Sequence, residues 1–150
     1  MSYQVPMSEV AVVVAITGAD PQEHFVYLHP HSEWREGPET MADYLNSTRR
    51  FFPMVLGGVA RMINREQIMW VRYEKLPDLT ESEDTAVEKL TILELTDGTR
   101  IEGNVPIDRP REQSRVSDVL NDPHEAFVRI DEENETCYVN KSFIRVVIPR

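Results

Sequence analysis

The sequence has a single cysteine, Cys137, and only six glycines in 150 residues. One cysteine excludes a disulfide within the chain and is typical of the reducing cytoplasm. So few glycines disfavour a phosphate-binding loop. The longest apolar run, 10–16, is too short to cross a membrane as a helix, and residues 1–7 lack the basic start and apolar stretch of a signal peptide. We therefore expect a cytoplasmic protein with no membrane partner.

Basic residues are also scarce: 16 lysines and arginines stand against 26 acidic residues, which gives a net charge of −10. A charge of this sign repels polyanions and disfavours non-specific binding of nucleic acid or of an anionic membrane. The apolar content of 41% and the charged content of 28% are those of an ordinary globular protein.

One pattern runs through the chain twice, in residues 10–73 and 90–149. The motif Asp-x-Leu-Asn occurs in both halves, and an Asn-basic turn followed by an isoleucine closes each of them. Length differences fall between the expected elements, as in a duplicated fold. The matched residues are Thr17 and Thr96, Asp43 and Asp118, Asn46 and Asn121, Phe52 and Phe127, Val55 and Ile130, Asn64 and Asn140, and Arg65 and Lys141.

Alternating apolar residues between turn-forming residues predict short strands. Asp97-Gly98 and Gly57-Gly58 are typical hairpin turns. Pro38 indicates a helix start, and Asn46 a left-handed helix cap. Acidic residues dominate 74–89, which predicts a solvated linker. Strands are expected at 10–17, 24–28, 51–56, 59–64, 67–73, 90–96, 99–107, 126–130, 136–139 and 143–148, with helices near 38–46 and 116–121.

These elements predict a mostly-β fold of two tandem ββαββ small-barrel repeats, 1–73 and 90–150, because closure into small barrels removes exposed strand edges. Residues 90–108, LTILELTDGTRIEGNVPID, and 137–150, CYVNKSFIRVVIPR, resemble the Sm-like proteins, and 62–73 is a weaker version of the second segment. The resemblance implies Sm/SH3-like barrels, edge-to-edge assembly and an RNA-binding turn at Asn64, Arg65, Asn140 and Lys141. The paired motifs are also similar to those of small bacterial proteins without an assigned function.

Three groups of residues are candidate binding sites. The pairs Asn64-Arg65 and Asn140-Lys141 could grip a phosphate or a carboxylate, or could be tight turns in which asparagine adopts positive φ. Arg111 and Arg115, with Asn140-x-Ser142, resemble the PilZ pattern for cyclic dinucleotides, or are surface arginines. Trp34 and Trp70 could contact a protein partner, or fill a core between the halves.

No motif for catalysis, a cofactor or a metal is present in the sequence. His29-Pro30-His31 lacks the helical spacing and the cysteines of a metal site, and no nucleophile motif occurs. We therefore expect a non-catalytic bacterial adaptor or assembly module that binds another protein, with a homo-oligomer as one form of assembly. An Sm-like RNA-binding protein and a PilZ-like cyclic-dinucleotide-binding barrel are the alternatives.

Overall fold

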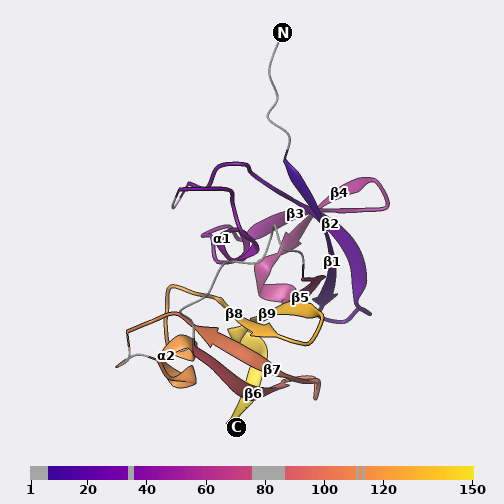
Figure 1. The fold of residues 1–150 in the computed structure, drawn as a ribbon. Coiled ribbons are helices and arrows are strands. Elements are labelled where there is room, and N and C mark those ends of the chain that lie inside the picture. Colours follow the sequence, from indigo (N-terminus) through magenta and orange to yellow (C-terminus); the bar gives the residue numbers. More distant parts are fainter. Residues whose placement is uncertain (1–6, 34–35, 76–86, 111, 113) are drawn as a thin grey trace.

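In the computed structural model, the strands of the described residues belong to one antiparallel sheet with the order β10-β6-β7-β8-β9-β5-β1-β2-β3-β4 (Figure 1). The structure describes residues 7–33, 36–75, 87–110, 112 and 114–150. The elements are β1 (Ser8–Ile16), β2 (Gln22–Leu28), α1 (Met41–Leu45), β3 (Phe51–Leu56), β4 (Val59–Asn64), β5 (Ile68–Glu74), β6 (Val87–Leu95), β7 (Arg100–Ile107), α2 (Val116–Leu120), β8 (Phe127–Asp131), β9 (Glu135–Asn140) and β10 (Ile144–Pro149).

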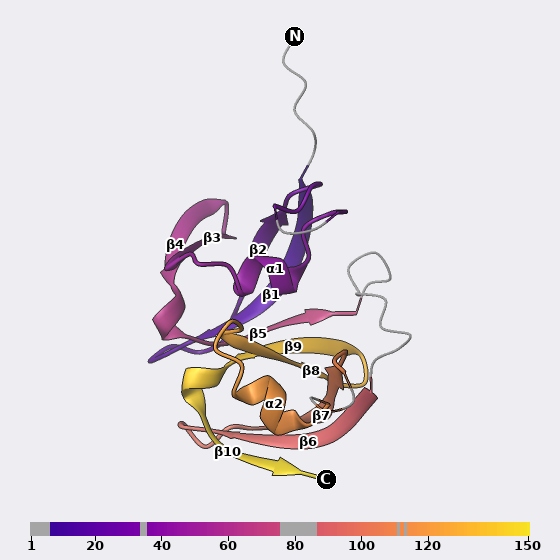
Figure 2. The same ribbon diagram turned by 90° about the vertical axis from the view of Figure 1, so that its left-hand side faces the viewer.

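The sheet has two parts, which we call the first half (β1–β5) and the second half (β6–β10). The first half has the order β5-β1-β2-β3-β4, and the second half the order β10-β6-β7-β8-β9. The parts meet where β5 pairs with β9, a contact that we call the junction. In Figure 2, β5 and β9 run side by side between the two halves, and β10 lies at the far end of the second half. The strands β4 and β10 are therefore the two ends of the sheet.

Local hydrogen bonds recur at matched places in the two halves. Thr17 N and Thr96 N donate to Gln67 O and Phe143 O, each in the turn before the last strand of its half. Two short 3₁₀ turns, Arg65–Gln67 and Lys141–Phe143, precede those strands. Each last strand then has a register shift at its start, between Ala15 and Ile16 of the β1–β5 pair and between Ile144 and Val146 of the β10–β6 pair.

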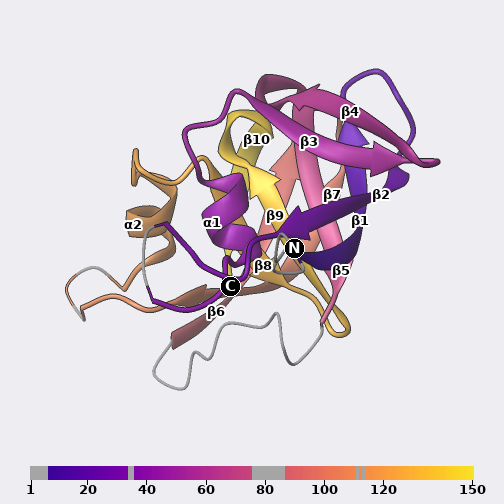
Figure 3. The ribbon, with the colours of Figure 1, turned by 90° about the horizontal axis from the view of Figure 1, so that it is seen from above.

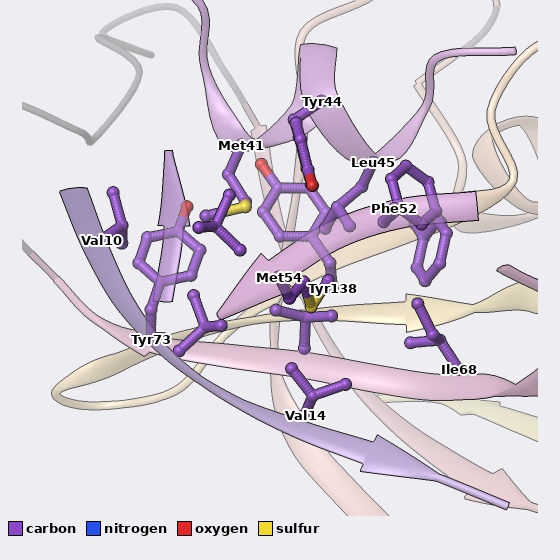
Figure 4. Packing of buried hydrophobic residues seen from close by; sticks show 14 of the residues in the cluster. Val10, Val14, Met41, Tyr44, Leu45, Phe52, Met54, Ile68, Tyr73 and Tyr138 are labelled. Atoms are coloured by element: carbon purple, nitrogen blue, oxygen red, sulfur yellow. The ribbon is translucent and has the colours of Figure 1, made fainter. Parts of the chain in front are cut away.

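The apolar cores of the halves extend across the junction. The core of the first half is formed by residues such as Val14, Tyr44 and Phe52, and it also includes Phe127 and Tyr138 from the second half. Figure 4 shows Tyr138 among the side chains of the first half. The core of the second half in turn includes Trp70 from β5. The junction thus lies inside the core and is not a surface contact between two independent bodies.

The prediction of a mostly-β protein is confirmed, and each predicted strand matches an observed one to within three residues at either end. The sheet is not closed into a barrel, because β4 and β10 do not pair with each other. Each half also has five strands, so the ββαββ description leaves out the last strand. β5 ends at Glu74 and β6 starts at Val87, inside the predicted linker 74–89, of which residues 76–86 lie outside the described residues.

Three local predictions were wrong. Helix α1 is capped by Thr40 and starts at Met41, after Pro38. Asn46 has a φ of −91° and is no left-handed cap, and the described residues with positive φ are all glycines. Phe51 pairs with Asn64 as Phe127 pairs with Asn140, so Phe51 and not Phe52 is the counterpart of Phe127. Apolar alternation allowed this slip of one residue because Phe51 and Phe52 are neighbours.

Gly103 lets two strands of the second half approach closely. A Cβ atom at this position would lie 2.4 Å from the backbone oxygen of Asp131 in β8. The strands β7 and β8 pair only at Asn104 and Asp131, next to this approach. A side chain at position 103 would therefore push β8 away from β7 at their point of contact.

We predict that Gly103→Ala lowers the free energy of unfolding by about 2 kcal/mol, because backbone atoms must move to admit the methyl group. Urea denaturation followed by circular dichroism measures the change. Glu102→Ala is the control, since residue 102 is exposed on the same strand and should change stability by less than about 0.5 kcal/mol. Equal effects at the two positions would contradict the prediction.

Candidate functional site

The two predicted Asn-basic turns have the same local structure. Asn64 Oδ1 accepts a hydrogen bond from Glu66 N at 3.0 Å, and Asn140 Oδ1 accepts one from Ser142 N at 3.0 Å. Their φ angles are −66° and −67°, so these asparagines form tight turns without the positive φ that one of the two interpretations allowed. Their side chains cap the 3₁₀ turns, as is typical of asparagine.

The basic residues of these turns hold the ends of the two helices. Lys141 Nζ donates to Val119 O at 2.6 Å and to Asp122 O at 3.1 Å, at the end of α2. Arg65 donates to Ser47 O at 3.1 Å, just after α1. Burial lowers the pKa of Lys141, while nearby Glu125 and Asp122 act in the opposite direction. Both cations thus bind backbone carbonyl groups at the C-terminal ends of the helices.

The remaining predicted site residues have different structural roles and do not form one site. Arg115 is the N-cap residue of α2 but makes no capping hydrogen bond with its side chain, which is 79% exposed with Asp118 at 4.0 Å. Arg111 and Trp34 lie outside the described residues. Trp70 is buried in β5 at the junction, with the Arg72 guanidinium 4.5 Å from the centre of its ring. The structure therefore brings Trp70, Asn140 and Arg65 together at the junction and leaves Arg115 on the surface.

At the junction, β5 and β9 pair over five residues, with Trp70 opposite Val139, Val71 opposite Tyr138 and Arg72 opposite Cys137. Asn140 is buried and connects the halves, because its Nδ2 donates to Arg65 O at 3.2 Å and to Ile68 O at 3.0 Å. One side chain thus caps its own turn and satisfies two carbonyls of the other half.

A second set of contacts joins the halves beside the paired strands. Asn46 Oδ1, at the end of α1, accepts a hydrogen bond from Phe127 N in β8 at 2.9 Å. The rings of Tyr73 and Tyr138 stack with their centres 6.3 Å apart. Asn46 was predicted to cap the helix in a left-handed backbone conformation. It instead contacts the second half through its side chain.

The two ends of the sheet expose the counterparts of these junction residues. On the β4 side, Met62 is 64% exposed, whereas its counterpart Tyr138 is 3% exposed. Phe51 is 45% exposed and its counterpart Phe127 is 1% exposed. On the β10 side, Val146 is 42% exposed and its counterpart Trp70 is 7% exposed. Apolar residues exposed along unpaired edge strands are typical of association sites.

The sequence prediction missed these exposed residues. An apolar residue in an alternating strand is assigned to the core, and alternation cannot reveal that a strand lies at the end of a sheet. The available signal was the match between the halves, because Val59 and Met62 on β4 correspond to Glu135 and Tyr138 on β9. If β9 pairs with a strand of the other half, its counterpart β4 has no such partner within the chain and stays exposed.

Comparisons with known proteins find no matching family model, no matching curated protein and no matching solved structure. Among the described residues, no helix has the length and apolar character to cross a membrane. Within the same part of the chain, no group of three or more histidine, cysteine or acidic side chains is placed to hold a metal ion.

The buried contacts of Asn140 predict an unequal effect of two matched substitutions. Asn140→Ala removes the turn cap and both hydrogen bonds across the junction, so we expect the free energy of unfolding to fall by about 3 kcal/mol. Asn64→Ala removes only a turn cap within one chain and should lower it by about 1 kcal/mol. Chemical denaturation at low protein concentration makes the comparison, and equal losses would contradict the role of Asn140 at the junction.

Burial raises the pKa of the Cys137 thiol to about 12, although Arg72 lies near it and acts in the opposite direction. At pH 8 the folded protein therefore holds this group as an inaccessible thiol and not as the reactive thiolate. We expect a thiol reagent such as DTNB to modify Cys137 only after unfolding. Stoichiometric modification of the folded protein within minutes would contradict this prediction.

Proposed function

We propose that this chain is a non-catalytic, cytoplasmic assembly module built from two copies of one Sm-like unit, and that its first partner is a second copy of the same chain. Assembly would be head to tail, with β10 of one copy paired to β4 of the next. The observation that carries the proposal is the junction, where β5 and β9, the counterparts of β10 and β4, already pair within the chain.

The junction supplies the register for such a contact. We replace each β5 residue of the junction by its β10 counterpart and each β9 residue by its β4 counterpart. This places Val146 opposite Ile63, Val147 opposite Met62 and Ile148 opposite Arg61. This register would cover Met62 and Val146, which are exposed in the single chain. Pro149 has no N–H group, so β10 offers one donor fewer than β5 does.

A polar group at the β4 end also fits this contact. Asn64 Nδ2 has no hydrogen-bond partner among the described residues, while Nδ2 of its counterpart Asn140 donates to Arg65 O and Ile68 O. The matching acceptors on a second copy are Lys141 O and Ile144 O, in the turn before β10. The proposed pairing would thus give Asn64 the partners that Asn140 has.

The contacts of the basic residues do not favour the RNA-binding alternative. Lys141 and Arg65 point to carbonyl groups at the ends of the helices. A cation used in this way offers fewer donors to a phosphate, and the net charge of −10 repels the nucleic acid backbone.

Two blocked variants test the proposal. Val146→Glu places a charge on the β10 edge, and Met62→Glu places one on the β4 edge; both residues are exposed, so the fold should be retained. We expect each variant alone to be a monomer in sedimentation velocity, while an equimolar mixture forms a 1:1 dimer, because one variant keeps an intact β4 edge and the other an intact β10 edge.

Val87→Glu is the matched control, because Val87 is a similarly exposed valine that pairs with Ile107 of β7 and lies on β6, which is not an end strand of the sheet. This variant should associate as the unmodified chain does. The proposal is wrong if the unmodified chain stays a monomer at high concentration. A dimer of Met62→Glu alone would replace the head-to-tail arrangement by β10–β10 pairing.

A further inference from the structure

Each half has a pocket at the same place, but only the pocket of the second half is also lined by a helix of the other half. The first half has a pocket of about 590 Å³, and the corresponding pocket of the second half has about 170 Å³. Matched residues line the two pockets: Tyr27 and Pro106, Tyr44 and Val119, Phe51 and Phe127, and Met62 and Tyr138.

The cover of the smaller pocket is α1 of the first half. Ala42 and Asn46, on α1 and at its end, line this pocket together with residues of β7 and β8. Asn46 fixes the helix there through its hydrogen bond with Phe127 N. Seen from above, α1 and α2 lie on the same side of the molecule (Figure 3).

Helix α2 has the features that α1 uses for this contact. Both helices have five residues and begin with the same bond, from the backbone N of Thr40 or Arg115 to Asp43 or Asp118 at 3.0 Å. Ser117 and Asn121 occupy the places of Ala42 and Asn46, and both are exposed. Leu120 is partly buried, whereas the corresponding Leu45 is fully buried.

We infer that the open pocket of the first half is the seat of α2 from a second copy, with Asn121 Oδ1 accepting a hydrogen bond from Phe51 N. This inference rests on the proposed head-to-tail assembly and adds to it a second contact, beside the paired strands. The helix covers Phe51 and Met62, which lie in the pocket and are exposed in the single chain. Recognition of a second copy thus depends on a helix as well as on backbone pairing, which by itself carries little specificity.

The mixture of the two blocked variants tests the helix contact separately from strand pairing. In that dimer, α2 of the Met62→Glu copy faces the pocket of the Val146→Glu copy. Asn121→Ala in the Met62→Glu copy should raise the dissociation constant about fivefold, the effect of one lost hydrogen bond. Phe51→Ala in the Val146→Glu copy should raise it about tenfold, because apolar contact area is lost.

The same substitutions placed in the opposite copies are the matched controls. There, α2 and the pocket face solvent, so the dissociation constant should stay within about twofold of that of the parent pair. Sedimentation velocity or calorimetry measures the constant, and circular dichroism confirms that each variant is folded. A dimer whose affinity is unchanged by any placement, or is reduced equally in both placements, would overturn the helix seat and leave the strand pairing intact. Absence of the dimer would overturn both.

Discussion

The pairing of β5 with β9 is the contact on which the rest of the structure depends. A unit of about 65 residues buries too little surface to be stable with much margin, and an edge strand of each half would otherwise expose its backbone groups. Pairing solves both problems at once, since it satisfies the backbone and joins two cores. Asn140 then fixes the relative position of the halves, because its amide reaches two carbonyls of the other half.

The sequence predicted the strands well because apolar alternation and turn residues act locally. It could not predict the conformation of the asparagines, since the role of Asn46 and Asn140 depends on partners about 80 and 70 residues away in the chain. The choice between positive φ and a side-chain cap is decided by these partners, and both options suit asparagine. The sequence also could not predict whether the sheet closes into a barrel, because apolar alternation is the same in a barrel and in an open sheet.

The candidate site followed only in part from the sequence. The two Asn-basic turns stand out as repeated motifs, and the structure places Asn140 at the junction and Asn64 at the β4 end. The functions of Arg65 and Lys141 as helix caps require knowledge of where each helix ends in space. The exposure of Phe51 and Met62 was not predicted, because it depends on which strands lie beside them and not on the residues themselves.

The two end strands of the sheet, β4 and β10, differ, and this difference determines the form that the proposed assembly can take. A contact between β10 and β4 leaves a free β4 on one copy and a free β10 on the other, so the same contact can repeat. The rotation at each step decides whether the copies close into a ring or continue as a filament. The junction defines one such rotation, between the two halves of a chain. If the contact between chains has the same rotation, every half has equivalent neighbours. In the proposed assembly, repulsion between copies of charge −10 would oppose this growth and would weaken as salt screens it. A higher ionic strength would then favour the larger assembly.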